Sequence, residues 1–403
     1  MRTYKRLFEF MLIPQIVAKC TLEAAKGKTH RPEVMYSIKH FDKTYDHVVR
    51  CAKDPNYRPC EDNVHEIIDG ANNKAREIEK PKFCPEQILH HMIIEPFKEI
   101  LMDGLYSEVY GCLPPIQVKT PSGNYKKKKF GPHMAIKRLK KWVWKKKKTY
   151  VCETDIHHAY ASVIISVLIK QLRKVIKDEE WIRLVSQFLH YYPNEKGCED
   201  IRGLILGHYT SPWFFNFYLK EFDHFAASLK EVKYMRYADN MFLVGHSKRR
   251  VHKALEKMKE YLETELGMTL NGCTQVYRFE HEDKDGNIKG RAVNALGCII
   301  HHNRLTLRKG ILERFRRKAN KVKHKVNKTW HDGSSIFSRF ATIRFTDTKT
   351  YCNKYIKPGL NTRELKRKVR THSKRMHPII EERRRIINDG LEKSKRLARG
   401  SSG

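Results

Sequence analysis

One stretch, residues 232–245, constrains the fold of this chain more than any other. Its two short apolar segments, residues 232–236 and 241–244, are joined by the polar sequence Tyr237-Ala238-Asp239-Asn240. Asp and Asn tolerate the backbone angles of tight turns, so the pattern predicts a β-hairpin. A carboxylate at the tip of a buried hairpin is costly unless it is paired, hydrogen-bonded or bound to a metal. A plain surface turn explains the same residues, and other segments have to decide between the two interpretations.

The charge of the chain narrows its partners. The formal net charge is +36 over 403 residues, and Lys and Arg are spread along the whole length. This distribution is typical of nucleic-acid binders, with an anionic membrane as the competing partner. No uncharged apolar run approaches the ~20 residues that a membrane span needs, so we expect no membrane partner. The ten cysteines form no Cys-x-x-Cys pair, which favours a reduced cytoplasmic location without structural zinc.

Residues 1–60 are expected to be mainly helical. Residues 1–19 combine basic side chains with an interrupted apolar run and lack a small-x-small cleavage site. That pattern favours a packed amphipathic helix over a signal peptide. The helical stretch is expected to end at Gly27, and Pro32 suits the first turn of the next helix.

Residues 61–150 are expected to mix strands and helices. Residues 66–70 and 76–78 predict paired strands, and the apolar spacing of residues 87–105 predicts a helix. Two lysine runs next to aromatic residues follow, namely Lys126, Lys127, Lys128 and Lys129, and then Lys145, Lys146 and the lysines after them. Interleaved basic and aromatic residues suit a phosphate backbone with stacked bases. A solvated helix face explains the same runs, but the net charge favours nucleic acid.

The middle of the chain carries a second acidic residue next to a strand. Residues 149–158 predict a strand that runs into Asp155. Residues 202–213 predict a glycine-containing loop that opens a helix, with Ser211 as its N-cap and Pro212 at its first position.

The remaining segments complete a mixed pattern. Residues 251–266 predict an amphipathic helix, and Asp285-Gly286 predicts a second hairpin. Residues 294–300 predict one short apolar strand. From residue 308 onward the chain is basic and is predicted to be mostly helical.

Asp155 and Asp239 form the candidate chemical centre. Each lies beside an apolar strand, and the helix-opening loop falls between them in the sequence. Two carboxylates brought together in a basic protein need a counter-charge, and Mg²⁺ is usually held by one or two carboxylates plus substrate phosphates. Two such ions about 3.5–4 Å apart clamp the attacking and leaving oxygens of an in-line phosphoryl displacement. The pattern therefore favours two-metal nucleotidyl transfer, with a strand-end cap as the alternative for Asp155.

Further segments follow one another in a characteristic order. They are Lys74-Ala-Arg-Glu-Ile-Glu-Lys-Pro81, Gly131-Pro-His-Met-Ala135, Asp155-Ile-His-His-Ala-Tyr160, Gly203-Leu-Ile-Leu-Gly-His-Tyr-Thr-Ser-Pro212, Tyr237-Ala-Asp-Asn240 and Asn294-Ala-Leu-Gly297. In this order the chain resembles, from about residue 4 to about residue 321, the reverse transcriptases of bacteria and phages. That group includes the enzymes of retrons and of diversity-generating retroelements, as well as abortive-infection and defence-associated enzymes. The resemblance implies an α+β right-hand polymerase fold with fingers, a palm and a helical thumb.

The resemblance assigns roles around the catalytic centre. It implies that Asp155 and Asp239 are metal ligands, that Ile156 offers its backbone carbonyl to a metal, and that Asn240 occupies a catalytic position. Tyr160 matches the steric gate, whose ring lies where a ribose 2′-hydroxyl must fit and thereby favours deoxynucleotides.

The resemblance also assigns substrate contacts. It implies that Arg76, with Lys74 beside it, contacts the incoming triphosphate, and that Leu206 and Gly207 support the nascent base pair. Further nucleic-acid contacts are implied for the palm residues Ser211, Tyr237, Leu296 and Gly297, the last two in the segment that resembles the primer grip.

Three departures from the family pattern are visible. Asn240 stands where the family has a second Asp, which keeps an oxygen ligand but loses a charge and can shift activity toward Mn²⁺. Leu206 occupies a position that is often Gln in faithful enzymes, so the resemblance implies relaxed fidelity. The loop at residues 270–274 lacks the lysine that the family often carries there.

The sequence thus predicts an N-terminal helical segment at 1–60, fingers at 61–150, a palm at 151–300 and a basic thumb with an extension at 301–403. The predicted function is RNA-directed DNA synthesis with Mg²⁺ or Mn²⁺, copying a structured non-coding RNA in anti-phage defence or a retroelement. The expected partners are an RNA template, a DNA product and dNTPs, and an accessory protein or a homo-oligomer is compatible. Template-independent or protein-primed DNA synthesis and a catalytically silent RNA-binding paralogue are the alternatives.

Overall fold

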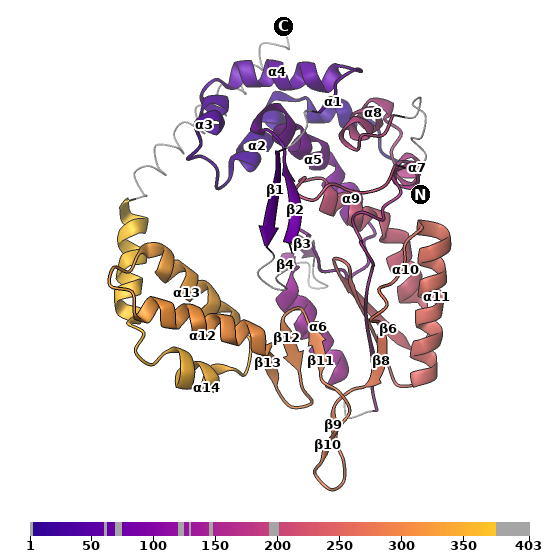
Figure 1. Ribbon diagram of the computed structural model, residues 1–403. Coiled ribbons are helices and arrows are strands. Elements are labelled where there is room, and N and C mark those ends of the chain that lie inside the picture. The colour runs from indigo at the N-terminus through magenta and orange to yellow at the C-terminus, as the bar shows by residue number, and fades with distance from the viewer. Residues whose placement is uncertain are drawn as a thin grey trace.

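The computed structural model describes residues 3–59, 63–68, 75–119, 125–128, 130–144, 148–192 and 201–375. The predicted contact residues Lys74, Lys129, Lys145 and Lys146 lie outside these ranges. The described residues form helices and antiparallel sheets, with the strands lying between an N-terminal helical layer and a C-terminal helical part (Figure 1).

The N-terminal layer is helical, as expected. Its elements are α1 (Leu7–Met11), α2 (Pro14–Ala25), α3 (Pro32–Lys39) and α4 (Phe41–Lys53), which gather with α5 (Ile88–Met102) at the top of Figure 1. The stretch predicted as one helix over residues 1–19 is interrupted at Ile13, because α2 begins anew with Pro14 at its first position. Pro32 opens α3 in the same way.

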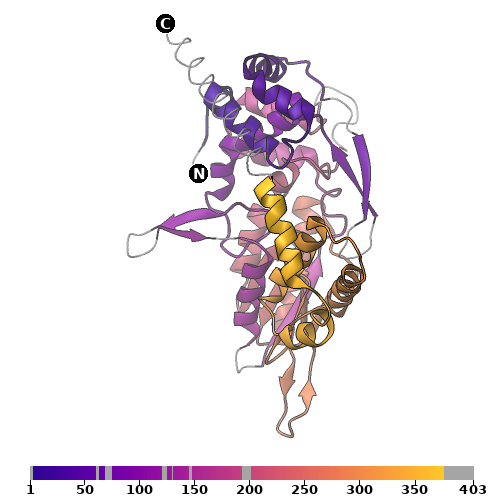
Figure 2. The ribbon, with the colours of Figure 1, turned by 90° about the vertical axis from the view of Figure 1, so that its left-hand side faces the viewer.

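Two hairpins extend from the region predicted as fingers. Strands β1 (Asn63–Ile68) and β2 (Ala75–Lys80) pair antiparallel, which confirms the predicted strand pair and sets Arg76 opposite Ile67. The turn η1 (Phe83–Gln87) then leads into α5. Strands β3 (Ile116–Lys119) and β4 (Tyr125–Lys128) form the second hairpin, which projects from the body in Figure 2 and carries Lys126, Lys127 and Lys128 in β4. The predicted helix after Gly131 is α6 (Pro132–Val143).

The central sheet has the strand order β6-β7-β5-β8. It consists of β5 (Tyr150–Asp155), β6 (Val232–Tyr237), β7 (Asn240–Gly245) and β8 (Gln275–Arg278), all antiparallel. The predicted hairpin around Asp239 is confirmed as β6 and β7. The helices around this sheet are α7 (Ile165–Val175), α8 (Glu179–Phe188), α9 (Ser211–Tyr218), α10 (Lys220–Ser228) and α11 (Lys248–Leu266).

The central sheet is buried on both faces. Tyr234 and Leu243 belong to the apolar core shared with the N-terminal helices and with α7–α11. Their chain neighbours Met235 and Phe242 belong to a second core, shared with α6 and the C-terminal elements. Successive strand side chains point to opposite faces, so a sheet covered on both sides needs continuous apolar runs. This explains why residues 232–245 carry so little polar sequence.

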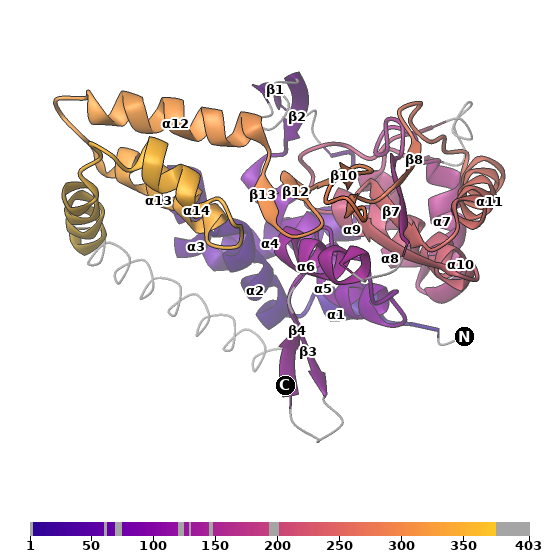
Figure 3. The ribbon, with the colours of Figure 1, turned by 90° about the horizontal axis from the view of Figure 1, so that it is seen from below.

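The C-terminal part begins with small strands and continues as helices. Strands β9 (His281–Glu282) and β10 (Ile288–Lys289) form the predicted hairpin, whose turn contains Gly286 with a positive φ of 81°. A three-stranded sheet follows, made of β11 (Val293–Ala295), β12 (Cys298–Ile300) and β13 (Leu305–Leu307). The helical elements are α12 (Lys309–Lys323), α13 (Trp330–Ile343), α14 (Lys349–Tyr351), η3 (Cys352–Ile356) and a helix at 362–375, which lie to one side of the central sheet in Figure 3.

The single strand predicted for residues 294–300 was wrong, because a turn divides it. Leu296 and Gly297 adopt positive φ values of 50° and 85° and reverse the chain between β11 and β12. The short apolar run could not distinguish one strand from two, since both bury the same residues.

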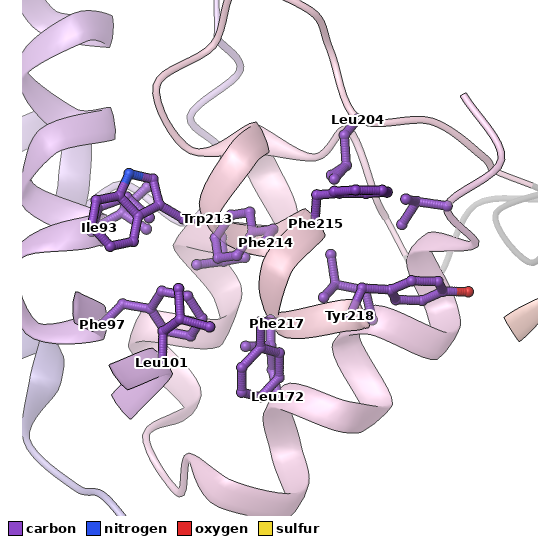
Figure 4. Close-up of a cluster of buried hydrophobic side chains, with 14 of the residues drawn as sticks. Ile93, Phe97, Leu101, Leu172, Leu204, Trp213, Phe214, Phe215, Phe217 and Tyr218 are labelled. Carbon is purple, nitrogen blue, oxygen red and sulfur yellow. The ribbon is translucent and has the colours of Figure 1, made fainter. Parts of the chain in front are cut away.

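An aromatic cluster joins the N-terminal layer to the helices beside the sheet (Figure 4). The ring of Phe97 in α5 packs edge-on against Phe214 and Phe217 of α9, at centroid distances of 5.4 and 5.3 Å. It also stacks at 5.7 Å on Trp181 of α8. The aromatic residues of α9 that Phe97 contacts are therefore part of the core.

Phe214→Ala should lower the free energy of unfolding by about 3–5 kcal/mol, because it leaves a cavity among side chains that cannot collapse onto it. Phe214 is fully buried, whereas Val326 is 90% exposed. Urea denaturation checks this, with Val326→Ala as the control that should change stability by less than about 0.5 kcal/mol. Equal effects of the two substitutions would contradict the assignment of this cluster as core.

Candidate active site

The hairpin β6–β7 and strand β5 bring the two predicted carboxylates together. Tyr237 pairs with Asn240 across the hairpin, so Ala238 and Asp239 form its tip, and Ala238 adopts a positive φ of 52°. On the other side of β7, Asn240 pairs with Asp155 at the end of β5. The backbone N–H of Ile156 donates to the carbonyl oxygen of Asp239 at 3.4 Å. Asp155 and Asp239 therefore lie side by side at one end of the sheet.

Each of these carboxylates accepts a hydrogen bond from an asparagine amide. Asn240 Nδ2 donates to Asp239 Oδ1 at 2.8 Å. Asn271 Nδ2 donates to Asp155 Oδ2 at 3.3 Å, and the Asn271 backbone N–H donates to the Asp155 carbonyl at 2.8 Å. Asn271 lies in the loop at residues 270–274, for which the sequence analysis noted only a missing lysine. Its contact with Asp155 was not predicted, because only the folded chain places that loop beside β5.

The donor set at this point of the sheet suits a hard divalent cation. Carboxylate and amide oxygens are ligands that Mg²⁺ and Mn²⁺ accept, whereas zinc prefers Cys and His. Among the residues that the structure describes, no group of three or more His, Cys, Asp or Glu side chains is placed to hold a metal. Asp155 and Asp239 therefore fit a cation that completes its coordination with substrate phosphate oxygens and water. The prediction that Ile156 contributes its carbonyl stays a prediction.

A buried arginine supports the tip of the hairpin from inside the protein. Arg236 has no exposed side-chain surface, and its Nε and Nη2 donate to the two carboxylate oxygens of Asp223 at 2.8 and 2.6 Å. Its Nη1 donates to the carbonyl of Ala238 at 2.9 Å and to Asn216 Oδ1 at 3.0 Å. Burial by itself lowers the pKa of Arg236, but Asp223 outweighs it and holds the pKa above its usual value. The charged guanidinium thus fixes the Ala238 carbonyl, one residue before Asp239.

A short segment before the β3–β4 hairpin holds the same tip from outside. The N–H of Tyr110 donates to the Arg236 carbonyl at 3.0 Å, and the N–H of Arg236 donates to the Glu108 carbonyl at 3.1 Å. A Cβ at Gly111 would lie 2.2 Å from the backbone nitrogen of Ala238, so only glycine permits this approach. Sequence reasoning gave Gly111 no role at this tip and missed Arg236, although a basic residue inside an apolar strand was the available signal.

Tyr160 lies at the floor of the site. Its ring stacks on Phe215 with a centroid distance of 4.8 Å and an interplanar angle of 15°. Burial, with the nearby Cys112 and Asp239, raises the pKa of the Tyr160 hydroxyl above its usual value. Tyr160 is therefore a neutral, fixed aromatic ring next to Asp239 at physiological pH.

The helix-opening loop joins β2 through backbone contacts. The N–H of Glu79 donates to the Leu206 carbonyl at 2.8 Å. A Cβ at Gly207, whose φ is 109°, would lie only 2.1 Å from the Glu79 carbonyl oxygen. The Leu206 side chain is 37% exposed. This junction sets the loop beside the strand that contains Arg76.

Ser211 does not cap α9, in contrast to the prediction. The N-cap position is Thr210, and Ser211 is the first helical residue. The Ser211 hydroxyl is buried and donates to the Ile205 carbonyl at 2.6 Å, so it closes the loop on itself. A tertiary contact across the loop therefore competes with local capping, which sequence spacing could not reveal.

The other predicted nucleic-acid contacts lie on neighbouring elements. Tyr237 and Leu296 are partly buried against the same apolar core, so the structure gathers them on one side of the central sheet. Gly297 lies close to α12, where an added Cβ would meet the Ile311 side chain at 3.0 Å.

Comparison with known proteins gives one matching family. Residues 112–300 match the family described as reverse transcriptase (RNA-dependent DNA polymerase). No curated protein matches the chain. Among solved structures, the chain is similar to apo telomerase from Candida tropicalis truncated from its C-terminal domain, with 11% identity and a TM-score of 0.40. The similarity covers 61% of this chain and 54% of the telomerase chain, so it spans about half the length of that protein.

The family match includes the candidate catalytic centre. Residues 112–300 contain both Asp155 and Asp239 and form a reverse-transcriptase domain. The mixed helix-and-sheet architecture is consistent with a right-hand polymerase fold, as predicted, and the matched family is that of RNA-directed DNA polymerases, which are nucleotidyltransferases. Enzymes of the matched family copy an RNA template into a DNA product and generally use divalent cations such as Mg²⁺.

Arg236→Leu should lower the free energy of unfolding by about 3–5 kcal/mol, because it leaves the Asp223 carboxylate buried without its cation. Urea denaturation measures this loss. Arg236→Leu combined with Asp223→Asn removes both charges and keeps an acceptor for the Tyr234 hydroxyl, which donates to Asp223 at 2.8 Å. The combined variant should regain stability.

Polymerase activity should respond differently, because the Ala238 carbonyl has lost its donor in both variants. Primer extension by the combined variant, measured well below its melting temperature, should stay at least about tenfold below wild type. Wild-type extension by this variant would contradict a positioning role for Arg236.

Proposed function

We propose that this chain synthesises DNA on an RNA template by two-metal nucleotidyl transfer. The observation that carries the proposal is the placement of Asp155, at the end of β5, beside Asp239, in the turn that leads into the adjacent strand β7, inside the matched residues. The net charge of +36 supports a nucleic-acid substrate.

In the proposed reaction the primer 3′-hydroxyl attacks the α-phosphate of a dNTP, and pyrophosphate leaves. Asp155 and Asp239, with the Ile156 carbonyl, would hold the cations. Bound Mg²⁺ or Mn²⁺ supplies the positive charge that offsets the attacking and leaving oxygens. Tyr160 presents its ring where a ribose 2′-hydroxyl would lie, so ribonucleotides are excluded by contact.

The remaining roles concern the substrate rather than the cations. Arg76 and Lys74 would contact the triphosphate. Leu206 and Gly207 would support the nascent base pair, and an apolar Leu206 offers no hydrogen bond to check it. The predicted nucleic-acid contacts are Lys126, Lys127, Lys128, Lys129, Lys145, Lys146, Ser211, Tyr237, Leu296 and Gly297.

Asn240 defines the electrostatic character of the site. Its amide donates to Asp239, so at this position the chain offers a neutral hydrogen-bond donor where the family has an acid. A site with one carboxylate fewer attracts a divalent cation more weakly. We infer that the enzyme works best at raised metal concentration or with Mn²⁺.

The biological setting of the proposal follows the family resemblance. In this proposal the chain acts as the retron, diversity-generating and defence-associated enzymes do, copying a structured non-coding RNA in the cytoplasm, alone or with an accessory protein or a second copy. Fingers at 61–150, a palm at 151–300 and a thumb from 301 are the proposed divisions. In the part of the chain that the structure describes, every helix is too short or too polar to traverse a bilayer.

The second candidate rests on Asn240. A weakened metal site suits a protein-primed or template-independent enzyme, or a silent RNA-binding paralogue. Retained label on the protein after denaturation would identify protein priming. Loss of both primer extension and labelling would identify the silent protein.

Asp239→Ala should reduce RNA-templated primer extension by at least about a thousandfold, because it removes a carboxylate from a site that has only two. Extension of a DNA primer on an RNA template with dNTPs measures this. Asp285→Ala, in the exposed turn between β9 and β10, is the matched control and should extend like wild type. Residual wild-type synthesis in Asp239→Ala would refute the proposed centre.

Asn240→Asp should lower the Mg²⁺ concentration for half-maximal extension by about tenfold and narrow the preference for Mn²⁺, because it adds a charge beside Asp239. Metal titrations of primer extension by the two proteins measure this change. An unchanged or higher metal requirement would show that the amide at position 240 is not what limits cation binding.

A further inference from the structure

A cavity lies behind the junction between β2 and the helix-opening loop. It has a volume of about 410 Å³, which is within the usual range of small-molecule sites. Its wall includes Glu79 of β2 and Ile205 of the loop, next to the Glu79–Leu206 hydrogen bond. Deeper in the protein it is lined by Glu86, His90, Phe188 and His208. Ile205 and His208, which line the cavity, therefore flank the two loop residues that would support the nascent base pair, Leu206 and Gly207.

The deepest polar group in this cavity is a neutral histidine. His90 is 1% exposed, its Nδ1 lies 3.1 Å from the Thr210 hydroxyl, and its Nε2 has no hydrogen-bond partner among the described residues. Burial, with the neighbouring His208, holds the pKa of His90 well below its usual value. A neutral imidazole carries one donor and one acceptor nitrogen. A buried polar atom without a partner costs about 1–3 kcal/mol, so a ligand that reaches Nε2 would remove this cost.

The walls suit a flat, uncharged ring. The Phe188 ring meets His90 edge-on at 4.7 Å, and the His208 ring lies tilted at 4.5 Å from His90. The described lining residues include Glu79 and Glu86 but no Lys or Arg, so a phosphate or triphosphate finds no counter-charge among them. The described residues also place no set of three metal ligands at this point. Aromatic walls with a neutral hydrogen-bonding group match the face and edge of a nucleobase.

We propose that this cavity receives one unpaired nucleobase of the template strand, turned out of the stack just ahead of the nascent base pair. A base carried by a strand keeps its phosphates outside and brings only its ring inside. The inference rests on the proposed function, since it takes Leu206 and Gly207 as neighbours of the nascent pair. It gives His90 and Phe188 a role in binding the template, separate from the catalytic roles proposed for other residues.

The test measures binding of primer–template duplexes whose RNA overhang has a single abasic position, moved along the overhang one nucleotide at a time. With wild-type protein, one position should weaken binding by about fivefold or more, and the others by much less, because only one base occupies the cavity. His90→Phe should weaken binding of the intact overhang to the same extent and should abolish the effect of that abasic position. The two losses should not add, because they remove the same contact.

Controls separate this contact from folding and from catalysis. His252→Phe, at an exposed position of α11, should bind like wild type, and Phe188→Leu should reproduce His90→Phe through loss of stacking if His90→Phe is unstable. No dNTP or divalent cation is added, so the outcome does not depend on polymerase activity, which primer extension tests separately. Equal weakening at every abasic position would overturn the proposal. So would a loss of binding in His90→Phe or Phe188→Leu that adds to the loss caused by the abasic position.

Discussion

The pairing of β5 with β7 is the constraint on which the site depends. The hydrogen-bond ladder sets Asp155 opposite Asn240. Because Asp239 directly precedes Asn240 in the β6–β7 turn, the same register also fixes the position of Asp239 beside Asp155. A slip of one residue in this register would turn the inward side chains of the strand to the other face. Both faces are filled with apolar side chains, so the sheet resists such a slip. Packing of the two cores thus fixes the geometry of the carboxylates.

Contacts inside the protein hold the tip of the hairpin in place against the repulsion between the two neighbouring carboxylates. Arg236 and Asp223 are both fully buried, and their mutual hydrogen bonds compensate for the loss of water around each charge. The guanidinium has donors left over, and one of them reaches the Ala238 carbonyl. Gly111 closes the turn from the other side. The tip of the hairpin is therefore held through its backbone, by the hydrogen bond to the Ala238 carbonyl and by the close approach of Gly111.

Two asparagines give the site its individual character. Asn240 and Asn271 each donate a hydrogen bond to one of the carboxylates, so a neutral amide helps to orient each acid. An amide fixes a carboxylate without cancelling its charge, whereas a lysine or arginine would compete with the metal. The backbone hydrogen bond between Glu79 and Leu206 joins the strand that contains Arg76 to the loop at residues 203–212. The cavity lined by His90 borders this junction, because Glu79 and Ile205 also line it.

The sequence by itself determined the elements that local pattern controls. The hairpin at residues 232–245, the strand ending at Asp155, the proline-opened helices and the turn at Gly286 follow from alternation and turn chemistry, and the order of the motifs indicated the polymerase fold. Tertiary structure decided what depends on distant partners. Ser211 bonds across its loop instead of capping α9, residues 294–300 turn back on themselves, and Arg236, Gly111 and Asn271 acquire their roles only from segments far away in the chain. Local spacing fixes which residues share a face, but a buried charge or a close backbone approach is defined by the neighbour that folding supplies.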